Sequence, residues 1–151
     1  MDTKSFTSLI ETIIDEVKTA VLATVDGKGR PQMRWMTPTI LPDRPGAIYA
    51  LTSPEFRKST HLSANPKVQW MFQTRTLNKL LSVNGLVNVV DNSAMKAEVL
   101  EGIGRRLHVF WKINTDPSKL IVLETIIVEG VYFEPMKGIK EQVIFNLENE
   151  E

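Results

Sequence analysis

Short apolar or alternating segments that end in turn-forming residues run through most of this sequence. Such segments predict β-strands, because side chains on a strand alternate between two faces and because Gly, Pro, Asn and Asp interrupt regular backbone. In the clearest case, residues 20–25 are followed by Asp26-Gly27-Lys28-Gly29 and a second extended segment at 30–40, which predicts a β-hairpin. Pro38 limits that second strand, since proline cannot donate a ladder hydrogen bond. Further strands are expected at 47–51, 67–74, 80–90, 120–128, 131–133 and 142–147.

Three segments predict helices. Apolar residues recur at helical spacing in residues 5–18, which is typical of a helix that packs on a core. A short helix is expected over 54–64, between the N-cap candidate Ser53 and the helix-ending pair Asn65-Pro66. A third helix is expected over 94–101, with Asp91-Asn92-Ser93 as its cap and Gly102 as its end.

Two glycines interrupt strand patterns and predict local irregularity. Gly85 predicts a bulge or a barrel bend, and Gly130 permits a kink between two strands. Residues 103–118 show no pattern that favours one structure.

The order of elements predicts an α+β fold, built on a small antiparallel β-barrel with an N-terminal helix and short inserted helices. Strict βαβ alternation is missing, and so are the glycine motifs of Rossmann and P-loop proteins, which argues against those classes. The 151 residues fit a single domain over 1–151, and the acidic tail at 148–151 is expected to be disordered.

The composition limits the classes of molecule that this protein is expected to bind. The 18 basic and 18 acidic residues cancel, which argues against a nucleic-acid surface but leaves room for a pocket that holds one phosphate. Cysteine is absent, so disulfides and thiolate chemistry are excluded. The N-terminus lacks the pattern of a signal peptide, and no apolar run reaches membrane-spanning length. We therefore expect a cytoplasmic protein that binds neither nucleic acid nor membrane.

The stretch that follows strand 47–51 is a candidate anion site. Thr52 and Ser53 precede the expected helix, whose first turn carries Arg57 and Lys58. Cations are unfavourable at the positive end of a helix unless an anion also binds there, so these four residues predict a phosphate cradle. The alternative is that both cations are solvated surface side chains offset by Glu55, and spacing alone does not separate the two interpretations.

Arg34 supports the anion interpretation from elsewhere in the chain. It lies in mid-strand between Met33 and Trp35, where a partly buried guanidinium needs a carboxylate or a bound anion. A metal site or a catalytic triad has little support in the sequence, because His61 and His108 are the only histidines and neither belongs to a metal or nucleophile motif. We expect no metal.

Three passages resemble the flavin-binding split-barrel proteins related to pyridoxamine 5'-phosphate oxidase, in particular the short members similar to general stress proteins. They are VLATVDGKGRPQMRWM, AIYALTSPEFRKSTHLSANPKVQWMF and LSVNGLVNVVD, and the resemblance covers roughly residues 5–134. It implies a six-stranded Greek-key barrel and a homodimer with FMN in clefts lined by both chains. It places the phosphate on Arg34, Ser53, Arg57 and Lys58, and the isoalloxazine ring against Trp35, Met36 and Thr37.

The sequence departs from the oxidase pattern at its substrate contacts. Thr39 stands where the oxidase has a lysine, the glutamine expected near Lys79-Leu80 is replaced, and the C-terminal segment lacks the oxidase's arginines. The expected function is therefore FMN-dependent redox chemistry on a small molecule, and not synthesis of pyridoxal 5'-phosphate. The alternatives are a flavin-binding stress protein without turnover and a relative that binds a deazaflavin or haem.

Overall fold

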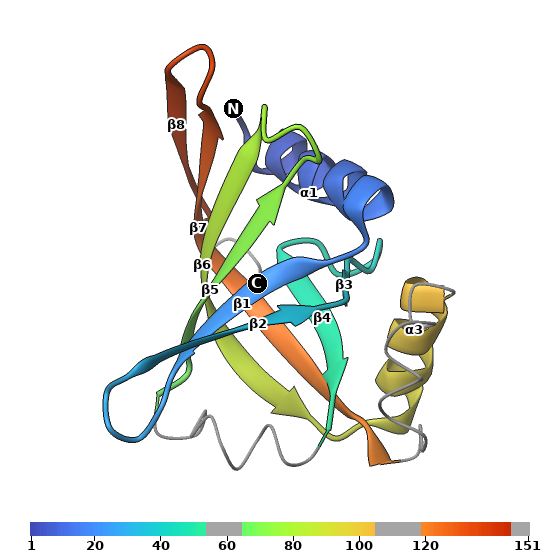
Figure 1. Ribbon diagram of the computed structural model, residues 1–151. Coiled ribbons are helices and arrows are strands. Elements are labelled where there is room, and N and C mark those ends of the chain that lie inside the picture. Colours follow the sequence, from blue (N-terminus) through green and yellow to red (C-terminus); the bar gives the residue numbers. More distant parts are fainter. Residues whose placement is uncertain (54–64, 105–118, 146–151) are drawn as a thin grey trace.

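Two helices and eight strands are formed by the residues that the computed structural model describes, 1–53, 65–104 and 119–145 (Figure 1). In chain order they are α1 (Thr3–Val17), β1 (Ala20–Val25), β2 (Pro31–Met36), β3 (Pro38–Thr39), β4 (Ala47–Thr52), β5 (Lys67–Gln73), β6 (Leu80–Val90), α3 (Ser93–Ile103), β7 (Ile121–Glu134) and β8 (Ile139–Ile144). The helix expected over 54–64, the stretch 105–118 and the tail at 148–151 lie outside the described residues.

All eight strands belong to one antiparallel sheet that curls on itself. Its hydrogen-bonded order is β2-β1-β5-β6-β7-β4-β3, with β8 added beside β7. The two ends of that path, β2 and β3, are separated in the chain only by Thr37. Because one residue spans only about 3.5 Å, the sheet has to curl until its edges approach each other. The expected α+β class is confirmed, and in place of the expected small barrel the described residues form a curled antiparallel half-barrel, with eight strands where the resemblance implies six.

The N-terminal helix is confirmed and covers the upper end of the curled sheet in Figure 1. Asp2 caps it by accepting a hydrogen bond from the Ser5 backbone N–H at 2.7 Å. Its buried stripe, Phe6, Ile10, Ile13 and Ile14, packs into the main core with residues of β1, β5, β6 and β7. The helical spacing of the sequence therefore marked the side that packs on the core.

The second described helix, α3, packs on the opposite side of β4. Ile48 and Ala50 of β4 face the main core, whereas Tyr49 and Leu51 face a second cluster that contains residues of α3. Strand β4 is therefore buried on both faces, which explains its uninterrupted apolar run.

The end expected for this helix is wrong. α3 continues to Ile103, and Gly104 follows as its C-cap with φ +55°. Gly102 lies inside the helix. A side chain has no room there, since a Cβ at this position would lie 2.9 Å from the Thr39 hydroxyl oxygen. The sequence pattern suggested that this glycine ends the helix, but the structure shows that it allows α3 to pack closely on β3.

Strand β7 corrects a second expectation. Residues 121–134 form one strand, without the break that Gly130 suggested. A Cβ on Gly130 would lie 2.2 Å from Cζ of Phe6, so this glycine makes room for the helix α1. The last strand also begins earlier than expected, at Ile139.

The irregularity expected at Gly85, a bulge or a barrel bend, is confirmed as a shift in strand register. The β6–β7 register shifts between Asn84, which pairs with Glu129, and Gly85, which pairs with Ile127. A Cβ at Gly85 would lie 2.5 Å from the Thr125 side chain and 2.7 Å from the Ile126 carbonyl oxygen. The neighbouring backbone therefore fixes this position as glycine.

We expect Gly85→Ala to lower the free energy of unfolding by about 1–3 kcal/mol, because the added methyl group has to displace backbone of β7. Urea unfolding followed by far-UV circular dichroism measures the change. The exposed Asn88→Ala on the same strand is the matched control. A Gly85→Ala variant as stable as the wild type would show that the bulge has room for a side chain.

Candidate functional site

Arg34 lies on the edge strand β2 as a half-buried cation. Its register partner is Leu22 of β1, whose carbonyl oxygen accepts a hydrogen bond from Arg34 Nη1 at 3.2 Å. Burial lowers the pKa of the Arg34 guanidinium, because it removes water that stabilises the charge. A guanidinium stays protonated at neutral pH, so the strand holds a partly desolvated positive charge.

A second polar group lies on the same face of the β1–β2 hairpin. The hydroxyl of Thr24 is buried, with the residue only 1% exposed, and has no hydrogen-bond partner in the described part of the chain. Thr24 follows Leu22 by two residues, which makes it a diagonal neighbour of Arg34 across the hairpin. A buried hydroxyl without a partner is costly, which makes Thr24 a candidate hydrogen-bond donor to a ligand oxygen. The sequence offered no signal for Thr24 beyond strand alternation.

The residues after Arg34 point in different directions. The Trp35 side chain is 64% exposed, whereas that of Met36 is buried in the main core. Thr37 lies between β2 and β3 and belongs to neither. Consecutive side chains alternate between the two faces of a strand. A single ligand can therefore contact the backbone of the segment expected to bind the ring, but side chains on only one of its faces.

The pairing of β3 with β4 brings the two expected halves of the site together. Pro38 stands opposite Ala50, and Thr39 stands opposite Tyr49. The same register carried back by two residues would set Met36 opposite Thr52, the buried last residue of β4. Ser53 follows it, partly exposed. Arg57 and Lys58, the remaining members of the expected cradle, lie outside the described residues.

A buried tyrosine supports the β4–β7 wall behind Thr52. Tyr49 is 1% exposed, and its hydroxyl donates a hydrogen bond to Glu124 Oε2 at 2.8 Å. Burial, and after it the negative Glu124, raises the pKa of the Tyr49 phenol, because both disfavour a phenolate. Sequence reasoning treated Tyr49 as part of an apolar strand and missed this pair.

Stability should therefore fall at alkaline pH through Tyr49. The folded phenol stays neutral, while an unfolded tyrosine ionises near pH ~10. The contribution of Tyr49 to the free energy of unfolding is therefore complete below that pH and is lost as the pH rises above it. We expect the wild type to lose about 1.4 kcal/mol of unfolding free energy per pH unit above pH 10 relative to Tyr49→Phe. Urea unfolding of both proteins between about pH 8 and 11, the range in which a free tyrosine changes charge, measures this difference in unfolding free energy. Parallel pH profiles would contradict it.

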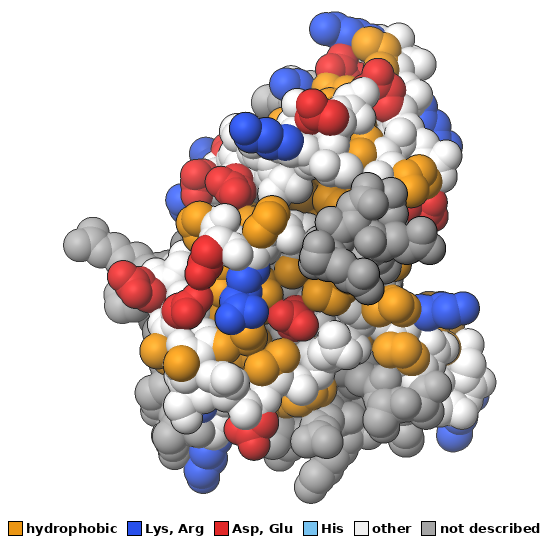
Figure 2. Space-filling view, turned by 180° about the vertical axis from the view of Figure 1, so that it is seen from behind, with side chains coloured by type: hydrophobic (Ala, Val, Ile, Leu, Met, Phe, Trp, Pro, Cys, Tyr) orange, Lys and Arg blue, Asp and Glu red, His pale blue; other side chains and the backbone are white. Residues whose placement is uncertain are grey.

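Charge and metal chemistry place few further constraints on the site. On the side of the molecule shown in Figure 2, hydrophobic side chains are interspersed with charged side chains of both signs, and neither sign dominates. Residues 1–53, 65–104 and 119–145 contain no cluster of three or more metal-ligating side chains. Of the helices in the described residues, none is long and apolar enough to cross a membrane.

The curled antiparallel sheet, closed at one end by a helix, defines the class as split-barrel proteins. The family model for pyridoxamine 5'-phosphate oxidase matches residues 6–131, and the chain belongs to this family. The resemblance seen in the sequence is thereby confirmed. A search of curated proteins finds no significant match.

Solved structures support the same fold. A protein related to general stress protein 26 from Clostridium acetobutylicum, of the pyridoxinephosphate oxidase family, superposes with a TM-score of 0.69 at 16% identity, with 98% of each chain covered. General stress protein 26 from Bacillus anthracis gives a TM-score of 0.67 at 20% identity, covering 91% of this chain and 98% of that one. A heme-binding protein from Mycobacterium smegmatis gives 0.66 at 17% identity, covering 89% of this chain and 56% of that one. At these identities the likeness establishes the fold alone.

Proposed function

We propose that this protein binds FMN and carries out redox chemistry on a small molecule. The observation that carries the proposal is Arg34, a half-buried cation placed where the β3–β4 pairing draws the ends of β2 and β4 together. Family membership supports FMN as the ligand, because the sequence resemblance implies it.

The donor set fits the phosphate end of FMN. Arg34 supplies a guanidinium, Thr24 a buried hydroxyl without a partner, and Thr52 and Ser53 further hydroxyls at the end of β4. Arg57 and Lys58 follow in sequence and complete the proposed cradle. FMN would supply the electron-transfer chemistry, while the chain binds and orients it. Backbone N–H groups near Met36 and Thr37 are the proposed hydrogen-bond donors to the ring.

Titration of the purified apoprotein with FMN tests this proposal. Binding should quench flavin fluorescence and saturate at one FMN per chain. A protein that stays colourless after incubation with FMN, and that shows no saturable quenching, would overturn it. Faster oxidation of a nicotinamide cofactor by the FMN-loaded protein than by free FMN would support turnover over a carrier or sensor role.

We also propose a homodimer in which β2, β1 and β5 face a second copy, with the flavin clefts between the chains. Trp35, Val21 and Met71 occupy one row across these three strands, because Val21 pairs with both of the others. Met33 and Trp35 are 75% and 64% exposed, which is unusual for large apolar side chains on a sheet face. Sedimentation should give a dimer at micromolar concentration, and Trp35→Lys should shift it toward monomer. A monomeric wild type would exclude the shared cleft.

Two finer features belong to the same proposal. The six-stranded Greek-key barrel would consist of β1, β2 and β4–β7, with the two-residue β3 and the added β8 outside it. The cytoplasm is the proposed compartment, in keeping with a chain that has no cysteine.

Haem is the second candidate ligand, because one structural neighbour is a heme-binding protein. An axial imidazole would have to come from His61 or His108, both outside the described residues. The visible spectrum of the purified protein and the mass of the released ligand separate haem, FMN and a deazaflavin. Replacing both histidines by alanine should abolish haem binding and leave FMN binding intact.

A further inference from the structure

A shallow hollow lies on the outer face of the sheet, where β6, β7 and β8 run side by side, and it contains none of the cradle residues. Its volume is 290 Å³, and it is lined by Leu80, Ser82, Val131, Phe133 and Lys140. Strand register explains this grouping, because Leu80 pairs with Phe133, Phe133 pairs with Lys140, and Ser82 pairs with Val131. The intervening residues, such as Leu81 and Tyr132, point into the main core.

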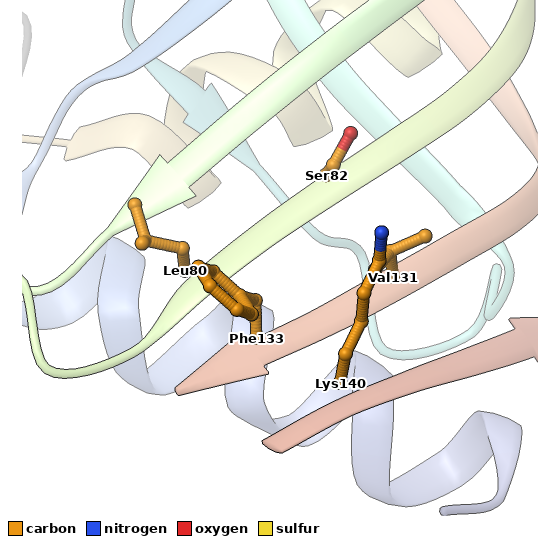
Figure 3. Close-up of a pocket in the computed structure, with 5 residues that line it drawn as sticks. All are labelled: Leu80, Ser82, Val131, Phe133 and Lys140. Atoms are coloured by element: carbon orange, nitrogen blue, oxygen red, sulfur yellow. The ribbon is translucent and has the colours of Figure 1, made fainter. Parts of the chain in front are cut away.

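The hollow has an apolar end and a polar end (Figure 3). Leu80 and Phe133 lie together at the apolar end. The Lys140 side chain runs toward Val131, so its ammonium lies on the same side as the Ser82 hydroxyl. Ser82 Oγ already accepts a hydrogen bond from Gln69 Nε2 at 2.9 Å, which leaves the hydroxyl proton for a ligand oxygen.

The nearby carboxylates have other partners. Glu129 accepts hydrogen bonds from Asn84 Nδ2 at 2.7 Å and Gln142 Nε2 at 2.9 Å. Glu134 pairs with Lys137 at 3.5 Å, and Glu141 pairs with the N-terminal amine at 3.8 Å. No carboxylate of the described ranges forms an ion pair with Lys140. The hollow therefore combines an apolar floor with one ammonium that has no described counter-ion.

We propose that this hollow binds a small amphipathic monoanion, namely an aromatic or branched aliphatic carboxylate. The apolar part lies against Leu80 and Phe133, and the carboxylate accepts hydrogen bonds from Lys140 and Ser82. Drug-sized ligands occupy pockets of about 300–1,000 Å³, so a hollow at the lower limit suits a single ring or a short branched chain. The inference does not depend on flavin binding, because the two sites share no residue.

Benzoate and its neutral analogue benzamide are the matched probes. We expect benzoate, titrated into the full-length ¹⁵N-labelled protein, to shift the backbone amide signals of residues 80–82 and 131–133. Benzamide should bind at least about tenfold more weakly than benzoate, because it lacks the charge that Lys140 recognises. Lys140→Gln should weaken benzoate binding by a similar factor, whereas Phe133→Ser should weaken both probes.

Lys137→Gln is the control, because Lys137 lies on the β7–β8 turn, pairs with Glu134 and does not line the hollow. It should bind benzoate as the wild type does, and urea unfolding checks that each variant is folded. Equal affinities for the two probes, or for wild type and Lys140→Gln, would overturn the proposal. So would amide shifts that depend on protein concentration and not on benzoate, since these would show a second copy covering the hollow. Benzoate binding in protein that takes up no FMN would keep this inference while the flavin proposal fails.

Discussion

Arg34→Ala should weaken FMN binding about 10- to 100-fold while the protein remains folded, since one charge-assisted contact contributes about 1.5–3 kcal/mol. The guanidinium is half-buried before any ligand binds, so part of its desolvation cost is already met in the fold. Lysine at this position should restore only part of the affinity, because an ammonium lacks the planar fork that matches a phosphate. Fluorescence titration with FMN measures both variants.

Arg30→Ala is the matched control for that experiment. Arg30 is exposed at the β1–β2 turn, and its hydrogen bond to Asp26 is made by the backbone N–H, which alanine keeps. This variant should bind FMN as the wild type does. Equal losses for Arg30→Ala and Arg34→Ala would indicate a diffuse charge effect, and no loss for Arg34→Ala would remove this residue from the cradle.

Phe6→Ala should lower the free energy of unfolding by about 3–5 kcal/mol, because a fully buried ring leaves a cavity between α1 and the sheet. Gly130→Ala should cost about 1–3 kcal/mol by itself, since its methyl group would overlap the Phe6 ring. The double variant should lose less than the sum of the two, because the cavity left by Phe6 accepts the new methyl group. Denaturant unfolding of all four proteins completes the cycle.

Met136→Ala serves as the control for that cycle. Met136 lies on the β7–β8 turn with its side chain exposed, so truncation should change stability by about 0.5 kcal/mol or less. Strict additivity of Phe6→Ala and Gly130→Ala would show that the two residues do not share one space. A Gly130→Ala variant as stable as the wild type would show that Phe6 does not require a glycine at this position.

Much of the fold could be predicted because its signals are local. The alternation in Lys67–Gln73 matches the observed burial, with Val68, Trp70 and Phe72 inside. The turn at Asp26–Gly29 forms where composition placed it, with the Asp26 carboxylate accepting the backbone N–H groups of Lys28 and Arg30. In each case the cause lies within a few residues of the effect.

The candidate site could be predicted less completely. Strand alternation indicated that Arg34 lies in mid-strand, yet the unsatisfied Thr24 hydroxyl beside it depends on the hairpin register and on burial by distant residues. The hollow at Leu80, Phe133 and Lys140 was not foreseen either, since it needs three strands to be set side by side.

The sequence by itself determined most of the strands, the packing helix and the irregular position at Gly85, because backbone preference and hydrophobic period act between near neighbours. Tertiary structure decided why residues 130 and 102 are glycines, which is to leave room for Phe6 and for Thr39, and it paired β3 with β4. Those features depend on contacts between segments far apart in the chain, and the curl of the sheet creates them.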